Sequence, residues 1–587
     1  MVARDRARWL AAAGLVGVSA AVVLWVRLLP LSLPSLPPDA RDLFRHRGAD
    51  GREHVYLGDF DSYLWVREAR NVLRTGTTCD AVVAGECRDT YANAPVGALM
   101  RYARSLHIAA IVAVHRMLDA IDPGIPLTTS SYWVPVFVGL AGVVPAIGIG
   151  WRLAGPLAGL VAAIAIGVNP LFLQRTIGSD NDVWNVVLPL WAAWAAIEAL
   201  EARERPARRL ALAALAGGVI ALHAATWSGW IFNGAVFAAA LGAAGVLSAL
   251  RVLAGRARID DLGWTLGVCV AVCVAATIGG VVAGATMLAL PQGLAGMLGF
   301  TTGSPVPSPV AAGIAWPDVF ATVGELTRPA LPDIAGVLEG PLYFFVAWLG
   351  LLLLLLPERE WQWWHFAVLV GGNFLYRYLL SATDLTPFAL VRLLALPLLA
   401  GGAIAIFEPD DRGHRGGLLV VIWFLAALFQ SFAGVRFILL LVAPFGILLG
   451  VAVGRLYAWA VRVSAPRIGA AWHRTVAVAL FVAGAAIVIP AINRGAAAAR
   501  AYRPMVHDGW WDALTALRET TPPDAIVTSW WDYGHWIKYV AERRVTSDGS
   551  TLSGHVAHWT GRMLLAPTER EAIGLIRMLD CGSDVGP

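Results

Sequence analysis

Long apolar stretches separated by short polar segments make up most of the chain. Because a helix needs roughly 20 apolar residues to cross a bilayer, the pattern predicts about thirteen membrane-spanning helices. The predicted spans lie near residues 10–30, 129–151, 155–173, 183–200, 209–224, 231–250, 265–288, 341–356, 363–381, 388–407, 417–433, 437–457 and 474–491. The first stretch shows no small-residue cleavage site, so we expect it to remain as an anchor.

One apolar stretch is too short to cross a membrane. Ile108–Val114 is bracketed by the basic side chains of Arg104, His107, His115 and Arg116. We therefore expect a helix that lies at the membrane surface.

Beyond the last predicted span the pattern becomes that of a soluble α/β domain. Leu514 and Leu517 share one face of a helix that starts near Trp510, and Pro522–Pro523 ends it. Ala525–Val527 then has the pattern of a buried strand. The chain ends at "MLDCGSDVGP", inside this domain, so we expect either a truncated chain with an incomplete domain or an unusually small domain. The predicted division is a membrane domain over 1–491, with external loops 31–128, 174–182 and 289–340, and an extracytoplasmic α/β domain over 492–587.

Composition and charge agree with this division. Hydrophobic residues make up 58% of the 587 and charged residues 15%, with a mean hydropathy of +0.64, which excludes an ordinary soluble protein. Basic residues gather at alternate span ends, so we expect the N-terminus inside and the C-terminal domain outside. The orienting residues are Arg4, Arg6, Arg8, Arg203, Arg205, Arg208, Arg209, Arg251, Arg256, Arg258, Arg412, Arg415, Arg455, Arg462, Arg467 and Arg474.

The five cysteines fit a chain with one oxidising side. Cys79 and Cys87 share the first external loop, where they can form a disulfide. Cys269 and Cys273 lie one helical turn apart in a predicted span, where we expect them to be buried. Cys581 has no evident partner.

Acidic residues recur at the predicted external ends of the spans. The segment "GDFDSYLW" carries Asp59 and Asp61, "GSDNDVW" carries Asp180 and Asp182, and "TVGEL" carries Glu325. Alternate carboxylates on a short turn can bind a hard divalent cation. Any one pair can equally cap a helix or face water. Three acidic sites on one face of a membrane bundle favour a functional site, because carboxylates near a bilayer are costly.

The tripeptide Trp-Trp-Asp occurs twice in the C-terminal part. Trp510–Trp511–Asp512 falls in the predicted amphipathic helix, so we interpret it as structural. Trp530–Trp531–Asp532 follows the predicted strand, where loops present functional side chains. Its two indole N–H donors and its carboxylate acceptor can bind a small hydroxyl group.

Together these motifs resemble the catalytic subunit of oligosaccharyltransferase in its single-subunit bacterial and archaeal forms. The resemblance covers nearly the whole chain in order. It rests on "WWDYG" at Trp530–Gly534, "FDSY" in the first external loop, "SDND" after the third span, "TVGE" in a later loop and "GVRFILLLVAP" at the start of a late span. It implies a polytopic α-helical membrane protein of the GT-C type with a small external α/β domain. We expect a multi-pass protein of the inner (cell) membrane, with its active site on the periplasmic or extracytoplasmic face.

The resemblance also implies an activity. The family transfers an oligosaccharide from a polyprenyl phosphate or diphosphate carrier to Asn in Asn-X-Ser/Thr of an acceptor polypeptide. Membrane lipid and these two substrates are the expected partners, and nucleic acid is not. By resemblance, Asp61 and Glu325 would accept hydrogen bonds from the acceptor amide. Asp61, Asp180 and Asp182, with Glu325 as a further ligand, would hold Mn²⁺ or Mg²⁺.

Two further roles follow from the resemblance. Arg436 would bind the departing phosphate, for which a guanidinium fork is suited. Trp530, Trp531 and Asp532, with Tyr533 and Gly534, would bind the Ser/Thr hydroxyl of the acceptor. The stretch from Glu325 to Arg436 is two helices longer than the family pattern, so Arg392 in "FALVRLLALP" is an alternative phosphate ligand. A family motif downstream of "WWDYG" that completes the hydroxyl pocket is not found.

Two other functions share some of these features. Another polyprenyl-phosphate-dependent membrane glycosyltransferase, acting on lipid or on Ser/Thr, would have the acidic first loop but no need for "WWDYG". A transporter would carry charges in mid-membrane and often internal repeats, neither of which the pattern shows. The "GSPVPSP" segment, Gly303–Pro309, predicts irregular backbone before Glu325, either as a mobile loop over the substrates or as an ordered cover.

Overall fold

The computed structural model describes residues 2–31, 45–48, 50–100, 105–202, 205–227, 229–284, 323–358, 361–382, 385–407, 414–464, 470–551 and 555–582. The "GSPVPSP" segment lies outside these residues, so the two interpretations of that loop both stand.

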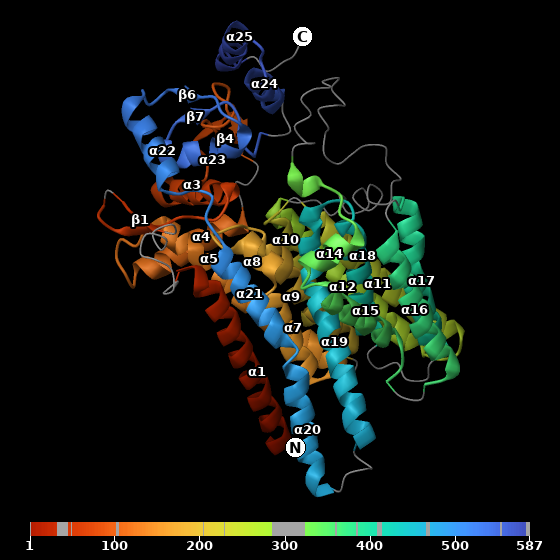
Figure 1. Cartoon of the computed structure of the whole chain (residues 1–587). Helices are drawn as coiled ribbons and strands as arrows, with labels where there is room; N and C mark the ends of the chain where they lie inside the picture. Colours follow the sequence, from red (N-terminus) through yellow and green to blue (C-terminus); the bar gives the residue numbers. More distant parts are fainter. Residues whose placement is uncertain are drawn as a thin grey trace.

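A bundle of long apolar helices forms most of the molecule (Figure 1). All thirteen segments predicted to span are helical where the structure describes them. The bundle contains α1 (Val2–Leu28), α5 (Leu127–Ala141), α6 (Val143–Ala154), α7 (Pro156–Gly167), α8 (Pro170–Thr176), α9 (Val183–Glu201), α10 (Pro206–Ala224), α11 (Trp230–Leu253), α12 (Ile259–Ala283), α14 (Leu331–Val337), α15 (Pro341–Leu355), α16 (Trp363–Ser381), α17 (Pro387–Phe407), α18 (His414–Ser431), α19 (Ile438–Ser464), α20 (Ala470–Ala485) and α21 (Val488–Ala501).

Fewer helices than thirteen meet the length and hydropathy of a membrane span. Within the described residues nine helical segments do, and eleven if the bent pairs α7–α8 (44°) and α14–α15 (101°) each count as one. The two predicted spans that do not qualify are α16, which carries His365, Asn373 and Arg377, and α18, whose apolar part is short. The count of thirteen therefore remains a prediction, while a multi-pass membrane protein is well supported.

Helix α19 lies at the centre of the bundle. Every residue from Ile438 to Gly454 is buried, and the helix packs against α7, α15 and α18. Helix α12, in contrast, packs mainly against α10 and exposes its other side. For this reason the expectation that both cysteines of α12 are buried is wrong, because Cys273 is exposed and Cys269 only half-buried.

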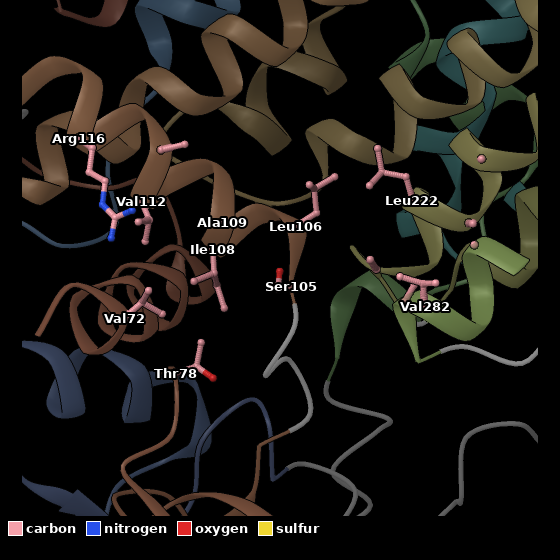
Figure 2. Close-up of a pocket in the computed structure, with 16 residues that line it drawn as sticks. Val72, Thr78, Ser105, Leu106, Ile108, Ala109, Val112, Arg116, Leu222 and Val282 are labelled. Carbon is pink, nitrogen blue, oxygen red and sulfur yellow. The ribbon is translucent and has the colours of Figure 1, made fainter. Parts of the chain in front are cut away.

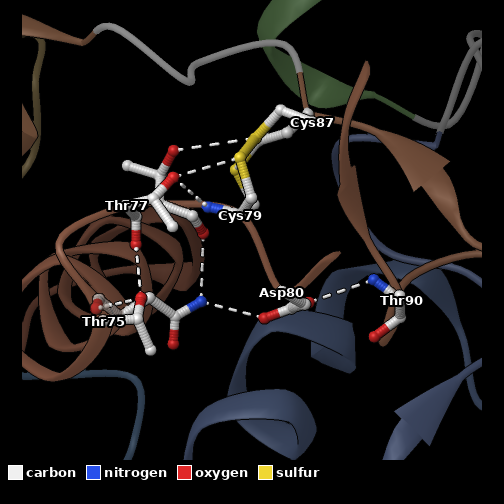
Figure 3. The surroundings of a disulfide bond; sticks show 9 residues. Thr75, Thr77, Cys79, Asp80, Cys87 and Thr90 are labelled. Carbon is white, nitrogen blue, oxygen red and sulfur yellow. Dashed lines mark hydrogen bonds between the residues drawn. A yellow bond between two sulfur atoms is a disulfide. The ribbon is translucent and has the colours of Figure 1, made fainter. Parts of the chain in front are cut away.

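The first external segment folds against the top of the bundle in Figure 1. Helix α4 is only 14 residues long and does not qualify as a span, in agreement with the predicted interfacial helix. The predicted disulfide between Cys79 and Cys87 is present (Figure 3). Beside it, Asp80 accepts hydrogen bonds from Thr90 N and from Asn71 on α3. The segment contains β1 (Arg45–Arg47), β2 (Glu53–Val55), α3 (Phe60–Thr75), β3 (Ala81–Val83), β4 (Glu86–Asp89), β5 (Ala98–Leu99) and α4 (Leu106–Asp119); β1 pairs with β2, and β3, β4 and β5 form an antiparallel sheet.

The C-terminal α/β domain packs on the first external segment. The predicted helix after Trp510 is present as α22, and the predicted strand as β6, which pairs with β7 in parallel. The strand is half-buried and not fully buried, because it belongs to a sheet of two strands only. The domain contains α22 (Asp508–Thr520), β6 (Ile526–Val527), the 3-10 turn η7 (Trp531–Tyr533), α23 (Gly534–Trp536), the π turn η8 (Ile537–Ala541), β7 (Arg544–Val545), α24 (His555–Leu564) and α25 (Glu569–Asp580). The preceding helix α21 runs on to Ala501, beyond the predicted boundary at 491.

Figure 1 places the N-terminus at one end of the bundle and the C-terminus at the other. The α/β domain, α3 and β4 lie together at the C-terminal end, where the acidic motifs also lie. The fold therefore gathers the acidic loops and the second Trp-Trp-Asp at one end of the helices.

Candidate active site

Two acidic loops meet at the end of the bundle, where their backbones touch. The N–H of Gly58 donates to the carbonyl of Gly178 at 3.2 Å. Gly178 has a φ of 97°, and a Cβ on it would lie 2.2 Å from Gly58 N, so only glycine fits there. This contact brings the "GDFD" and "GSDND" motifs side by side.

The first loop enters α3, which fixes both of its carboxylates. Asp59 caps the helix by accepting hydrogen bonds from Ser62 N at 2.9 Å and Ser62 Oγ at 2.7 Å. Asp61 lies in the first turn, where the helix dipole favours a negative charge. Its side chain is 59% exposed, so a substrate can reach it.

The buried side chain of His107 forms a hydrogen bond to the backbone of the second acidic loop. Trp184 Nε1–H donates to His107 Nδ1 at 3.2 Å, so the ring proton lies on Nε2, which donates to the carbonyl of Ser179 at 3.0 Å. Burial lowers the pKa of His107 to about 4 and keeps the ring neutral. Ser179 has a φ of 85°, an unfavourable region for any residue with a Cβ. The histidine thus stabilises the turn that presents Asp180.

Asp182 is oriented by polar side chains of the bundle. Asn185 Nδ2 donates to Asp182 Oδ1 at 2.9 Å, and His223 Nε2 donates to Asn185 Oδ1 at 2.9 Å. On its other side Asp182 Oδ2 lies 3.4 Å from Arg175 Nε. The Asp182 carboxylate is therefore held between the hydrogen bond from Asn185 and the guanidinium of Arg175.

Glu325 lies between two arginines. Its turn, η5 (Gly324–Leu326), is joined to the turn η6 (Val435–Phe437) by a hydrogen bond from Val435 N–H to the carbonyl of Thr327 at 3.0 Å. Arg436 Nη1 lies 3.6 Å from Glu325 Oε2, while Oε1 pairs with Arg175. Two segments that are far apart in sequence thus place an acid and a guanidinium together.

Sequence reasoning missed Arg175. A signal was present, because Arg175 is the only basic residue in the predicted external segment 174–182. Of the two arginines weighed as phosphate ligands, Arg436 lies beside Glu325, whereas the guanidinium of Arg392 stacks on the ring of Phe388 at 3.9 Å. The geometry favours Arg436.

The carboxylates crowd one another. The loss of bulk water and the charges of Asp59, Asp182 and Asp61 raise the pKa of Asp180 well above its usual value. A divalent cation relieves such crowding, and carboxylate oxygens are the ligands that a hard cation prefers.

The four predicted ligands do not form a closed metal site in this geometry. Among the described side chains, no three or more of His, Cys, Asp and Glu converge closely enough to hold a metal ion. One physical reason is that Arg175 pairs with both Asp182 and Glu325. The residues have the right chemistry for a hard cation, and a cation would have to compete with this guanidinium.

The "WWDYG" segment holds an unpartnered donor and a half-buried acceptor on consecutive residues. Trp531 Nε1–H is buried and has no hydrogen-bond partner among the described residues. Asp532 is half-buried; loss of water raises the pKa of its carboxylate, and hydrogen bonding to the side chain of Trp530 opposes the rise. A hydroxyl group, which accepts and donates, matches this pair.

Tyr533 and Gly534 fix the position of that pair. Tyr533 stacks on Trp510 with ring centroids 4.9 Å apart. A Cβ on Gly534 would lie 2.4 Å from the carbonyl oxygen of Ser547, so the turn needs a bare backbone to approach that strand end.

The first Trp-Trp-Asp is structural, as predicted. Trp510 packs against Trp536 and Tyr533. The ring centroid of Trp511 lies 3.9 Å from that of His46, and Asp512 is exposed. Trp510 also supports the second motif, a link that the sequence did not reveal.

The first acidic loop lies against the residues that directly follow the "WWDYG" motif. Phe60, next to Asp61, stacks on Trp536 with centroids 4.8 Å apart. His535 Nε2 lies 3.7 Å from Asp61 Oδ1. An acceptor that reaches both Asp61 and Asp532 would bridge α3 and the C-terminal domain.

An apolar cavity of about 760 Å³ lies between α3, α4, α10 and α12 (Figure 2). Ser105 and Thr78 are its only polar side chains besides Arg116, among the residues described there. The volume suits a ligand, but few polar groups converge to orient one. The cavity can accept an apolar chain without selecting its head group.

Comparison with known proteins assigns the family. Residues 46–493 match the family model described as "Oligosaccharyl transferase STT3, N-terminal", and residues 523–580 match "STT3/PglB/AglB core domain". The chain belongs to the STT3 family of oligosaccharyl transferases.

Relatives with curated names and solved structures agree with that assignment. The dolichyl-phosphooligosaccharide-protein glycotransferase of Methanococcus voltae is 22% identical over 91% of this chain, which spans 63% of that relative. The oligosaccharyltransferase AglB of Archaeoglobus fulgidus, solved with an inhibitory peptide and a dolichol-phosphate, has a TM-score of 0.63 and 17% identity, covering 96% of this chain and 68% of its own. The same enzyme tethered to an acceptor peptide with the NVT sequon has a TM-score of 0.63 and 15% identity, covering 97% and 68%. These structures establish that the fold is shared.

Proposed function

We propose that the protein transfers an oligosaccharide from a polyprenyl phosphate or diphosphate carrier to the Asn side chain of Asn-X-Ser/Thr in an acceptor polypeptide. The observation that carries this proposal is the unpartnered Trp531 indole N–H next in sequence to the half-buried Asp532, in a turn whose following residue His535 lies 3.7 Å from Asp61. A lipid- or Ser/Thr-directed transferase would not need to bind a hydroxyl group two residues after the residue that accepts the glycan. The A. fulgidus relative was solved with a dolichol-phosphate and with an NVT peptide, which supports the same substrates here.

The acceptor amide must be activated before it can attack. Its nitrogen lone pair is delocalised into the carbonyl, which makes it a poor nucleophile. Asp61 and Glu325 would accept hydrogen bonds from the two amide N–H groups and weaken this conjugation. Asp61 is accessible, and Glu325 is near enough for its charge to act on Asp61.

The acceptor hydroxyl would be bound by the "WWDYG" turn. Trp531 N–H donates to the hydroxyl oxygen and Asp532 accepts the hydroxyl proton, while Trp530, Tyr533 and Gly534 hold the turn in shape. A site built to bond a hydroxyl discriminates strongly against a peptide that lacks it, because its own buried groups then stay unpaired.

The departing phosphate needs positive charge. Arg436 offers a planar guanidinium within 3.6 Å of Glu325, so phosphate and amide would be held at one place. Asp61, Asp180 and Asp182, with Glu325 as a further candidate, would hold Mn²⁺ or Mg²⁺, which when bound supplies further stabilisation of the phosphate charge. The A. fulgidus relative has also been solved with Zn and sulfate, at a TM-score of 0.58 and 16% identity, covering 96% of this chain and 67% of its own.

We place the reaction at the periplasmic or extracytoplasmic face of the cell membrane. The charge pattern predicts this side for the acidic loops, and they lie at the same end of the bundle as the α/β domain and the Cys79–Cys87 disulfide.

The decisive experiment is transfer in vitro from lipid-linked oligosaccharide to a fluorescent Asn-X-Thr peptide, read by mass spectrometry. We expect a glycan on the Asn of that peptide and little on a matched Asn-X-Ala peptide. Transfer to lipid or to Thr, with none to Asn, would favour the alternative glycosyltransferase.

We expect transfer to need a divalent cation. Exhaustive chelation should abolish it, and Mn²⁺ or Mg²⁺ should restore it. The double substitution Asp180→Asn with Asp182→Asn should also abolish transfer, while peptide binding largely survives because the "WWDYG" turn is intact. Full transfer after chelation would contradict the metal proposal and leave the acceptor assignment standing.

A further inference from the structure

A buried chain of charges joins the C-terminal domain to the first external segment. Lys538 Nζ lies 2.6 Å from Asp89 Oδ2 and 2.5 Å from Asp548 Oδ2. Arg67 continues the chain from α3, with Nη1 3.4 Å from Asp89 and Nη2 2.8 Å from Asp80. Such pairs are costly to break once buried, so they fix the α/β domain relative to α3.

His535 extends this chain to Asp61. Its ring is 1% exposed, with Nδ1 3.6 Å from Asp548 Oδ2 and Nε2 3.7 Å from Asp61 Oδ1. Neither ring nitrogen has a hydrogen-bond partner within the described part of the chain. A buried imidazole with two unmet nitrogens, one of them aimed at an accessible carboxylate, calls for a functional account.

The surroundings leave the ring little freedom to move away. Trp536 stacks on Phe60, and Gly534 is pressed against the carbonyl of Ser547. Gly549 lies beside the contact, where an added Cβ would be 3.1 Å from His535 Nε2 and 3.5 Å from Asp61 Oδ1. A bare backbone therefore leaves room for the ring and the carboxylate to meet.

Each ring nitrogen faces one carboxylate, Asp548 Oδ2 at 3.6 Å from Nδ1 and Asp61 Oδ1 at 3.7 Å from Nε2. Asp548 Oδ2 is also paired with Lys538 Nζ at 2.5 Å, whereas Asp61 has no such cation within the described residues except this ring. His535 is the basic side chain nearest to Asp61 among the described residues. A neutral imidazole has one N–H, and in the Nε2–H tautomer that donor is directed at Asp61.

We propose that His535 is a positioning residue for the transfer reaction, donating its Nε2–H to Asp61 Oδ1 when the acceptor peptide is bound. The inference rests on the proposed function. The present 3.7 Å gap must shorten by roughly 0.5–1 Å to reach hydrogen-bond distance. Catalytic contacts are often long before substrate binds.

The two oxygens of Asp61 would then have different partners. His535 would hold Oδ1 and stop the carboxylate from rotating, which leaves Oδ2 for the acceptor amide N–H and the proposed cation. His535 directly follows Trp530–Gly534 in the chain. Binding of the acceptor hydroxyl at this motif would therefore affect the position of His535 and, through it, the orientation of the Asp61 carboxylate.

Three substitutions separate the donor from the shape of the ring. His535→Gln can place an N–H near the Nε2 position, His535→Asn near the Nδ1 position, and His535→Phe keeps a ring with neither. We expect kcat at saturating peptide to fall about 10- to 100-fold in the Phe and Asn variants, the usual effect of losing a group that orients a ligand. His535→Gln should retain most of the activity. The affinity for a fluorescent Asn-X-Thr peptide, measured without donor, should stay within about threefold, since the Trp531–Asp532 pair is untouched.

His46→Phe provides a matched control. Its ring also has two unpartnered nitrogens, but it packs on Trp511 and Tyr56, away from Asp61. The His46→Phe variant should leave kcat unchanged.

If His535→Phe transfers at the wild-type rate, or if His535→Asn works and His535→Gln does not, the positioning role is wrong while the proposed function stands. If all three variants lose activity together with peptide affinity and thermal stability, the ring is a packing element only, which also overturns the proposal. Wild-type protein that glycosylates no Asn-X-Thr peptide would refute the proposed function, and the positioning role with it.

Discussion

Single hydrogen-bonding groups decide what the "WWDYG" turn can recognise. A buried donor with no partner loses its hydrogen bonds to water on folding, and a ligand regains that energy by accepting from it. Trp531 Nε1–H is such a donor, and the Asp532 carboxylate beside it completes the match to a hydroxyl. Asp512, in the first Trp-Trp-Asp, is exposed, and it provides a control of identical composition.

Asp532→Ala should weaken the use of Asn-X-Thr peptide more than the use of the lipid-linked donor. The loss leaves the peptide hydroxyl short of an acceptor, at about 1–3 kcal/mol. That energy corresponds to about 5- to 150-fold in kcat/KM for peptide. Asp512→Ala should alter stability at most. The comparison of Asn-X-Thr with Asn-X-Ala peptides reads out the effect, and equal discrimination in wild type and Asp532→Ala would remove the hydroxyl role.

Arg436→Gln should impair transfer far more than Arg392→Gln. Arg436 lies beside Glu325, whereas Arg392 stacks on Phe388 of its own helix. Removing a charged group that binds phosphate in the reaction costs about 10²- to 10³-fold in rate. The KM for lipid-linked donor and kcat should be measured for both variants. The reverse order of effects would assign the phosphate to Arg392.

Helix α3 is the element that connects catalysis to domain docking. Its first turn carries Asp61, and its second and third turns carry Arg67 and Glu68, which face Asp89 and Lys538. A substitution in the docking cluster can therefore disturb the acidic site without touching it.

Glu68 makes this docking dependent on pH. Its side chain is 2% exposed, and burial raises its pKa from 4.5 to about 8 despite the nearby cations. The charge balance explains why the cations do not prevent this, since two positive groups already face three carboxylates. These groups are Arg67, Lys538, Asp80, Asp89 and Asp548.

The sign of the pH effect follows from the raised pKa. Between about pH 4.5 and 8 the folded state keeps a proton on Glu68 that the unfolded state has lost, so stability falls as pH rises across this window and levels off above it. Glu68→Gln remains neutral and should lack this loss. Thermal unfolding of both proteins from pH 5 to 9 should show a Tm difference that grows in favour of the variant up to pH 8. A difference that stays constant would show that Glu68 does not titrate in this range.

At the scale of the whole molecule, the sequence predicted what depends on local pattern. Apolar runs are sufficient to predict helices, and all thirteen predicted segments are helical where described. The pattern did not predict the 101° bend between α14 and α15 or the exposed face of α12, because both depend on which helices pack together.

The candidate site divides in the same way. The motif residues Asp61, Asp180 and Glu325 stand out in the sequence because carboxylates are rare beside apolar runs. Arg175 and His535 do not, since their importance comes from partners that are distant in the chain. Likewise the docking of Lys538 on Asp89 links residues 449 positions apart, which no local pattern encodes.

The orientation of the whole chain can be tested with its own cysteines. Cys581 is exposed in the C-terminal domain, and Cys79 and Cys87 are paired in the first external segment. If both regions face outward, a membrane-impermeant maleimide should label Cys581 in intact cells, and Cys79 and Cys87 should become labelled only after reduction. Cys581→Ser should remove the first signal, and a reporter fused after Pro587 should be active only outside the cytoplasm. Labelling of Cys581 only after the membrane is broken would place the α/β domain inside. Because Asp61 contacts His535 of that domain, the carboxylate site would then have to lie inside as well.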